Sequence, residues 1–230
     1  MPVTSQVTGT FAGMDTTMNA PISVDAARAL YTDGGSSHDF EHVLRVTALA
    51  ERIARAEGAD VAVVRTAALL HDIAESSGRA DHHQRGAARA REILADQPPE
   101  FAEAVAHAIE AHRFRAGPAP HTLEAQAVFD ADKLDITGAI GVARAFAYAG
   151  EHGNVLWNTP WRDIATADGN AVSQPKALGA AYTPSHEFVY KLDRISERLY
   201  TATARAIAAE REAFLRMFFD RLDEEAAGLA

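Results

Sequence analysis

The sequence predicts an all-α protein, a single helical bundle of about six to eight helices. Apolar residues recur every three or four positions through most of the chain, as they do on the buried face of a helix. No stretch alternates apolar or β-branched residues with polar ones in the way of a strand. A length of 230 residues, of which 47% are hydrophobic, is enough for one domain with a substantial core.

The predicted helices of the N-terminal half follow in order. A short helix over residues 24–31 comes first, and apolar residues at helical spacing then predict a helix over 39–57. Gly58 is placed to end that helix as a C-cap. Asp60 is placed to start the next helix as an N-cap, and this helix runs through an apolar stretch to the His-Asp pair at 71–72.

Further helices are predicted over residues 83–95, 99–113 and 122–149. Pro99 suits the first turn of the second of these helices, because an amide there has no intrahelical partner. Thr122 is the expected N-cap of the stretch that follows, which we interpret as one or two helices.

The helical periodicity stops at residues 150–184. This stretch is rich in Gly, Asn and Pro and contains Trp157 and Trp161, which predicts a long loop. We expect the two indoles either to stack on a base of a substrate or to anchor the loop by packing. A long helical region follows, from Ser185 to about Glu225.

Composition argues against several classes of function. The net charge of −10 argues against the phosphate backbone of nucleic acid as the main partner. Cysteine is absent, so neither a disulfide framework nor a thiolate metal site is available. No apolar run approaches the roughly 20 residues that span a bilayer. We expect a cytoplasmic protein with one domain over 21–227, preceded by a flexible leader over 1–20.

Three predicted helices each carry a His or an Asp on their apolar face. These groups are His42, His71 and Asp132, and Asp72 directly follows His71, roughly 100° further round the helix. Burial of such groups is costly without partners, and neutral imidazole and ionised carboxylate are ordinary ligands of divalent cations. The four residues therefore form a candidate metal-ligand set.

Two alternatives stay open at this level. A single His on an apolar face is often a core residue, and a single inward Asp often caps a neighbouring helix. In addition, Asp130 and Asp135 also have apolar neighbours, so the pattern alone does not choose between them and Asp132.

Further polar groups are candidates for contacts to a substrate. His83 and His112 lie on the apolar faces of their helices, whereas His82 is expected in solvent beside charged neighbours. Lys133 and Arg113 either meet phosphate oxygens or are surface charges beside their helices.

In order and wording these motifs resemble those of the HD-domain superfamily of metal-dependent phosphohydrolases. The family pattern His … His-Asp … Asp is matched by HDFEHVLRV at 38–46, by the pair at 71–72 and by DADKLD at 130–135. The resemblance extends over about residues 22–225, which is nearly the whole chain.

The sequences of these motifs are most similar to those of the YedJ/YpgQ-like bacterial branch of that superfamily. The chain shares with this branch a His-Arg pair at 112–113, the stretch FAYAG at 146–150 and the motif SHEF at 185–188. The paired second-metal histidines and Gly-Tyr-Pro motif of the cyclic-di-GMP phosphodiesterases are not both present, because no Gly-Tyr-Pro follows His82-His83.

The resemblance implies one divalent metal ion held by His42, His71, Asp72 and Asp132. It favours Asp132 over Asp130, because the last ligand of the family precedes a Lys or an Arg. The mixed His and Asp ligands suit Mn²⁺ first, with Fe²⁺, Co²⁺, Ni²⁺, Zn²⁺ or Mg²⁺ as other candidates.

The expected chemistry is hydrolysis of a phosphate ester or anhydride by metal-activated water. Asp72 or Glu75 would orient or deprotonate that water, and His38 is a further catalytic candidate. The residues expected to contact the substrate phosphate are His83, His112, Arg113 and Lys133.

The branch resemblance implies a nucleotide as substrate. The leading hypothesis is a (deoxy)nucleoside triphosphate pyrophosphohydrolase, and the alternative is a nucleoside 5′-monophosphate phosphatase (5′-nucleotidase). A helical binding or regulatory module that keeps a metal for stability alone is the hypothesis from a different class. We expect a monomer or a homodimer with a small phosphorylated ligand and with neither a nucleic acid nor a membrane as partner.

Overall fold

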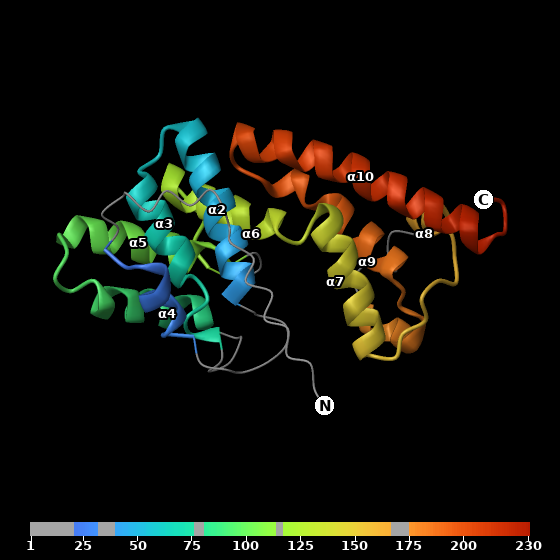
Figure 1. Cartoon of the computed structure of the whole chain (residues 1–230), viewed down its shortest axis with the longest axis horizontal. Coiled ribbons are helices and arrows are strands. Elements are labelled where there is room, and N and C mark those ends of the chain that lie inside the picture. Colours follow the sequence, from blue (N-terminus) through green and yellow to red (C-terminus); the bar gives the residue numbers. More distant parts are fainter. Residues whose placement is uncertain (1–20, 32–39, 76–80, 114–116, 167–174) are drawn as a thin grey trace, which may run out of the picture.

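The computed structural model describes residues 21–31, 40–75, 81–113, 117–166 and 175–230, and within these ranges every regular element is a helix (Figure 1). The α-helices are α1 (Val24–Arg28), α2 (Phe40–Glu57), α3 (Val61–Leu70), α4 (His82–Ile93), α5 (Pro99–Ala111), α6 (Leu123–Leu134), α7 (Gly138–Glu151), α8 (Trp161–Thr166), α9 (Pro184–Tyr190) and α10 (Ala202–Ala226). Three short 3-10 helices complete this part of the chain: η3 (Pro175–Ala181), η4 (Leu192–Arg194) and η5 (Ser196–Arg198). The all-α prediction is confirmed, with more helices than predicted.

Several helices begin and end at the residues that the sequence indicates. Asp60 accepts a hydrogen bond from the backbone N–H of Ala62 (2.8 Å) at the start of α3. Thr122 accepts one from the N–H of Ala125 (3.2 Å) at the start of α6. Gly58 has a φ of 78° after the end of α2, a left-handed conformation that glycine adopts without a steric penalty.

The helices pack in two groups, which Figure 1 shows side by side. In the first group α2 packs against α3 and α6, and α5 packs against α3, α4 and α6. In the second group α9 packs against α7 and α8. The long helix α10 contacts α2 and α6 as well as α7 and α8, so it connects the two groups.

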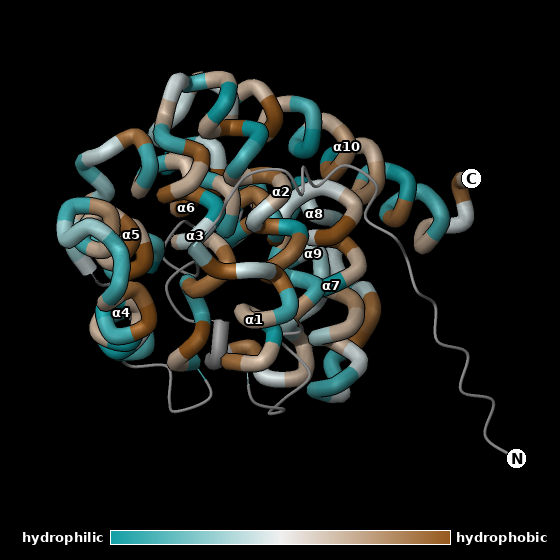
Figure 2. The backbone as a smooth tube through the Cα atoms, turned by 60° about the vertical axis from the view of Figure 1, so that its left-hand side comes forward, coloured by the Kyte–Doolittle hydropathy of each residue, from teal (hydrophilic) through white to brown (hydrophobic). Residues whose placement is uncertain are grey.

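Each group has its own hydrophobic core. The core of the first group consists mainly of alanine and branched aliphatic residues such as Val46, Leu69 and Ile109. The core of the second group is more aromatic, and the rings of Phe188 and Phe219 stack with their centroids 4.6 Å apart. Figure 2 shows hydrophobic and hydrophilic stretches alternating along the helices, as expected for helices with one buried face.

The predicted loop over residues 150–184 is partly helical, because α8 and η3 lie within it. Nε1 of Trp157 donates to Asp223 of α10 (2.7 Å), and Nε1 of Trp161 donates to Asp220 (2.8 Å). These bonds favour the anchoring role of the two indoles over stacking on a base.

The predicted helical region 185–225 is divided into α9 and α10. Between them the chain turns through η4 and η5, and the Asp130 carboxylate accepts hydrogen bonds from the N–H of Tyr200 (2.9 Å) and the hydroxyl of Thr201 (2.7 Å). A contact from a distant helix therefore sets the start of α10. Local periodicity carries no information about such a contact.

Two further predictions concern an N-terminal leader and the absence of a membrane-spanning helix. The predicted leader over 1–20 lies outside the described residues. Among the helices that are described, none combines the length and the apolar character needed to cross a bilayer.

Truncation of Phe219 to Ala is expected to lower the free energy of unfolding by about 3–5 kcal/mol, because the ring is fully buried. Chemical denaturation followed by circular dichroism measures this change. Met217→Ala on the same helix is the control: the Met217 side chain is 61% exposed, so its truncation is expected to change stability by less than about 0.5 kcal/mol. Equal stabilities of the two variants would contradict the core assigned to the second group.

Candidate metal centre

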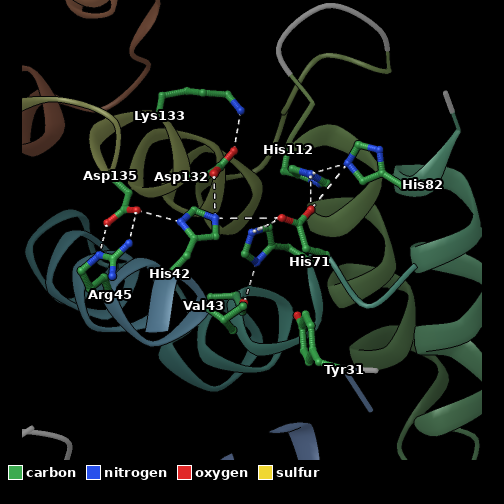
Figure 3. A network of polar contacts seen from close by, with 12 residues as sticks. Tyr31, His42, Val43, Arg45, His71, His82, His112, Asp132, Lys133 and Asp135 are labelled. Atoms are coloured by element: carbon green, nitrogen blue, oxygen red, sulfur yellow. Dashed lines mark hydrogen bonds and ion pairs between the residues drawn. The ribbon is translucent and has the colours of Figure 1, made fainter. Parts of the chain in front are cut away.

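Three helices of the first group bring the predicted ligands to one point (Figure 3). His42 lies in the first turn of α2, Asp132 lies in the last turn of α6, and His71 and Asp72 directly follow α3. Nε2 of His42 is 3.5 Å from Oδ1 of Asp132 and 3.9 Å from Oδ2 of Asp72. Nε2 of His71 is 3.3 Å from the same Asp72 oxygen. Residues that are far apart in the sequence thus share one small volume.

Hydrogen bonds on the far side of each imidazole orient the two rings. Nδ1 of His71 donates to the carbonyl oxygen of Ala68 (2.8 Å), since a carbonyl oxygen can only accept. Nδ1 of His42 lies 2.7 Å from Oδ2 of Asp135. When a ring is neutral with its proton on Nδ1, the lone pair of its Nε2 is available to a cation held beside the Asp72 carboxylate.

The charges of the centre compensate one another. Burial lowers the pKa of His71, but the nearby Asp72 outweighs burial and raises it to about 9. Burial also lowers the pKa of His42, but hydrogen bonds to Asp132 and Asp135 raise it above its ordinary value. Conversely, burial raises the pKa of Asp132, whereas Lys133 and the two imidazoles hold it well below its usual range. A cation that binds here displaces the proton of His71, so its affinity is expected to rise with pH up to about pH 9.

Asp135 and Arg45 support His42 from behind. The guanidinium of Arg45 donates to both oxygens of Asp135, at 2.8 and 2.9 Å, while Asp135 contacts Nδ1 of His42. A carboxylate on the far nitrogen of a ligand histidine fixes the ring and makes it a stronger donor. The sequence pattern left Asp135 as a competing ligand and did not identify Arg45. Arg45 lies three residues after His42 on the same helix, a spacing that places the two side chains on one face.

A second group of nitrogen atoms meets the other oxygen of Asp72. Nε2 of His82 is 3.5 Å and Nε2 of His112 is 3.4 Å from Oδ1 of Asp72, and the two nitrogens are 3.3 Å apart. These three side chains could hold a cation of their own. Alternatively, a proton on His82 completes a hydrogen bond to His112, whose Nδ1 contacts the carbonyl oxygen of Ile109 (2.5 Å).

The prediction that His82 lies in solvent is wrong, because its side chain is buried. The physical reason is its place at the start of α4, which packs against α5 and so against His112. Its charged neighbours Arg85 and Arg89 lie further along the helix and do not determine its environment.

Two other predicted site residues lie beside the centre. The ammonium group of Lys133 forms an ion pair with Oδ2 of Asp132. Burial raises the pKa of the Tyr31 hydroxyl well above its ordinary value, and the negative charges of Asp72 and Glu75 raise it further. Glu75 therefore lies near Tyr31. The structure thus places Lys133 next to a candidate ligand and Glu75 on the Tyr31 side.

The remaining predicted residues lie further out. His83 is buried, and burial together with the charge of Arg113 lowers its pKa. Its ring lies beneath Gly117, where a Cβ would come within 2.9 Å of the Glu110 carbonyl oxygen, so only glycine allows the chain to pass this closely. His38 lies outside the described residues.

The donor set fits a divalent cation. Two imidazole nitrogens and two carboxylates are available, and bonds of about 2.1 Å to one ion place neighbouring ligand atoms about 3 to 3.5 Å apart. The separations here, 3.3 to 3.9 Å, are close to these values. Nε2 of His71 is also buried without a hydrogen bond, which is the environment of an atom that needs a ligand.

Comparison with known proteins agrees with this geometry. The family model of the HD domain matches residues 39–137, the range that contains all four candidate ligands. YpgQ of Bacillus subtilis strain 168 is 32% identical over 208 residues, which cover 88% of this chain and 91% of YpgQ. The chain belongs to the HD-domain superfamily. HD domains bind divalent metals, in agreement with the clustered His and Asp residues.

Solved structures of HD-domain proteins share the fold. The crystal structure of Bacillus subtilis YpgQ in complex with ADP matches with a TM-score of 0.65 and 28% identity, over 88% of this chain and 92% of that one. An HD-superfamily hydrolase from Bacillus thuringiensis matches with a TM-score of 0.67 and 25% identity, over 89% and 94%. As an HD-domain protein related to such hydrolases, the chain is a hydrolase.

Replacement of Asp135 by Asn is expected to weaken the binding of Mn²⁺ by about 10- to 100-fold, because His42 loses the charged partner that orients it. Calorimetric titration with Mn²⁺ measures the affinity. Asp163→Asn, at an exposed position of α8, is the matched control and is expected to leave the affinity unchanged. An unchanged affinity in the Asp135→Asn variant would remove Asp135 from the support of the centre.

Proposed function

We propose that this hydrolase is a metal-dependent phosphohydrolase that acts on nucleotides, with pyrophosphate release from (deoxy)nucleoside triphosphates as the leading reaction. The observation that carries the proposal is the cluster of His42, His71 and Asp72, with Asp132 beside His42. Two more histidines and a lysine lie next to this cluster. The ADP bound to the related YpgQ supports a nucleotide as substrate.

One divalent ion, with Mn²⁺ as the first candidate, would be held by His42, His71, Asp72 and Asp132. Such an ion would lower the pKa of a bound water toward about 7 and would polarise a phosphoryl oxygen. The second group, at His82 and His112, would then face phosphate oxygens, or would hold a second ion.

The surrounding side chains provide the charge that a transferring phosphoryl group requires. The ammonium of Lys133 lies at Asp132, where it can donate to an oxygen of the substrate as well as to the carboxylate. Nε2 of His82 and of His112 lie on the other side of Asp72 and can donate when protonated. Arg113 follows His112 directly and is placed to meet a further phosphate. Positive groups thus flank the centre on two sides.

The attacking water requires an acceptor for its proton. Asp72 and Glu75 are the candidates within the described residues, and Asp72 is also shared between the two groups of histidines. The Asp72 carboxylate lies between four imidazoles, where it can orient a water while the imidazoles face the phosphate. His38 remains a predicted participant.

Incubation of the metal-free protein with Mn²⁺ and a panel of nucleotides tests this proposal. We expect pyrophosphate and a nucleoside monophosphate from a deoxynucleoside triphosphate, and loss of the activity in excess EDTA. Release of inorganic phosphate from nucleoside 5′-monophosphates would replace the leading reaction by the alternative one, a 5′-nucleotidase. Neither product from any nucleotide would overturn the proposal.

The double variant His71→Ala with Asp72→Ala is expected to lower kcat/KM at least about a hundredfold, since it removes two ligands. His152→Ala with Asp163→Ala, at two exposed positions, is the matched control and is expected to keep full activity. A helical circular dichroism spectrum in both proteins separates loss of chemistry from loss of fold.

A further inference from the structure

A cavity of about 510 Å³ is lined by Ala111 and Arg113 at the end of α5, by residues 117–120 and by residues 197–200 before α10. Its polar and aromatic lining residues are Arg113, Phe129, Glu197, Arg198 and Tyr200. None of the catalytic steps proposed above uses Glu197, Arg198 or Tyr200. Its volume is within the range of small-molecule sites.

The aromatic wall of the cavity is held in place by α6. The carboxylate of Asp130 accepts hydrogen bonds from the backbone N–H of Tyr200 (2.9 Å) and of Thr201 (2.8 Å). The ring of Tyr200 meets the ring of Phe129 edge to face, with centroids 5.2 Å apart. The Tyr200 side chain nevertheless stays 40% exposed, so this well-anchored ring has surface left for a ligand.

The aromatic wall of the cavity lies close to the metal centre. The ammonium of Lys133 lies 5.3 Å from the centre of the Phe129 ring and is paired with Asp132, a candidate metal ligand. Phe129 and Asp132 are three residues apart on α6, which is about 4.5 Å along the helix axis. His112 belongs to the second histidine group, and the next residue, Arg113, also lines the cavity. Lys133 and His112 therefore connect residues that line the cavity to the candidate metal centre.

The chemistry of the lining selects one half of a nucleotide. Tyr200 offers an aromatic surface, and the planar guanidinium group of Arg198 can stack on a base, while Arg113 would contact a phosphate. Glu197 repels phosphate oxygens, but its carboxylate accepts hydrogen bonds from the hydroxyl groups of a ribose and the amino groups of a base.

We propose that this cavity binds the nucleoside part of a nucleotide whose phosphate groups lie at the metal centre, with the base against the ring of Tyr200. The inference rests on the proposed function, because it assumes a phosphorylated ligand at the centre. The cavity would be the site at which the protein distinguishes nucleotides from other phosphate compounds. Tyr200 binds in this account and takes no part in the chemical step.

Calorimetric titration of the Mn²⁺-loaded protein with two non-hydrolysable ligands tests the inference. The ligands are α,β-methylene-ADP and methylenediphosphonate, which share the two phosphorus groups and differ by the nucleoside. Tyr200→Ala is expected to weaken binding of the nucleotide analogue about tenfold, the usual effect of losing one base–aromatic stack, and to leave the diphosphonate unaffected. Tyr200→Phe keeps the ring and is expected to retain the affinity.

Tyr148→Ala is the matched control, because Tyr148 is a similarly exposed tyrosine on α7 and does not line the cavity. It is expected to bind both ligands as the parent protein does. The inference is overturned if Tyr200→Ala weakens both ligands equally or neither of them, or if the parent protein binds the nucleotide analogue no better than the diphosphonate.

Hydrolysis of a deoxynucleoside triphosphate by the same protein preparations separates this inference from the proposed function. Binding that depends on Tyr200, without any hydrolysis, would keep the nucleoside site and remove the proposed reaction. Hydrolysis with binding that does not depend on Tyr200 would keep the reaction and remove the nucleoside site.

Discussion

The candidate site depends on the buried carboxylate of Asp72. Its two oxygens face different partners: Oδ2 lies near His42 and His71, and Oδ1 lies near His82 and His112. A carboxylate removed from water needs compensating charge or hydrogen bonds, and four imidazoles from α2, α4, α5 and the end of α3 provide them. The packing of four helices around one charge explains why the histidines are buried and why a cation fits between them.

In the proposed function, the two helix groups have separate roles. The first group holds the centre in a tightly packed core, where side chains have little freedom to move. The second group and α10 fix the segment that carries Tyr200, and Asp130 connects this segment to the helix that also bears Asp132. Chemistry and ligand recognition therefore share α6 as a common support. A shift of this helix would change both.

Sequence reasoning identified those parts of the site that depend on local pattern. The apolar faces of the helices placed His42, His71 and Asp72 inward, and the family motif chose Asp132 among three candidates. The burial of His82 and the contact of Asp135 with His42 could not be predicted in this way, because each depends on which helices pack together. Helix existence followed from periodicity, and cap positions followed from residue type. The break before α10 depends on distant hydrogen bonds to Asp130.

The central claim is that one divalent ion binds between α2, α3 and α6. Diffraction data collected at the manganese absorption edge from crystals grown with Mn²⁺ test it most directly. The account predicts an anomalous peak within bonding distance, about 2.0 to 2.2 Å, of His42, His71, Asp72 and Asp132. A peak at His82 and His112 in addition would mark a second ion. A bound manganese ion away from the four ligands, or no peak among them, would contradict the account.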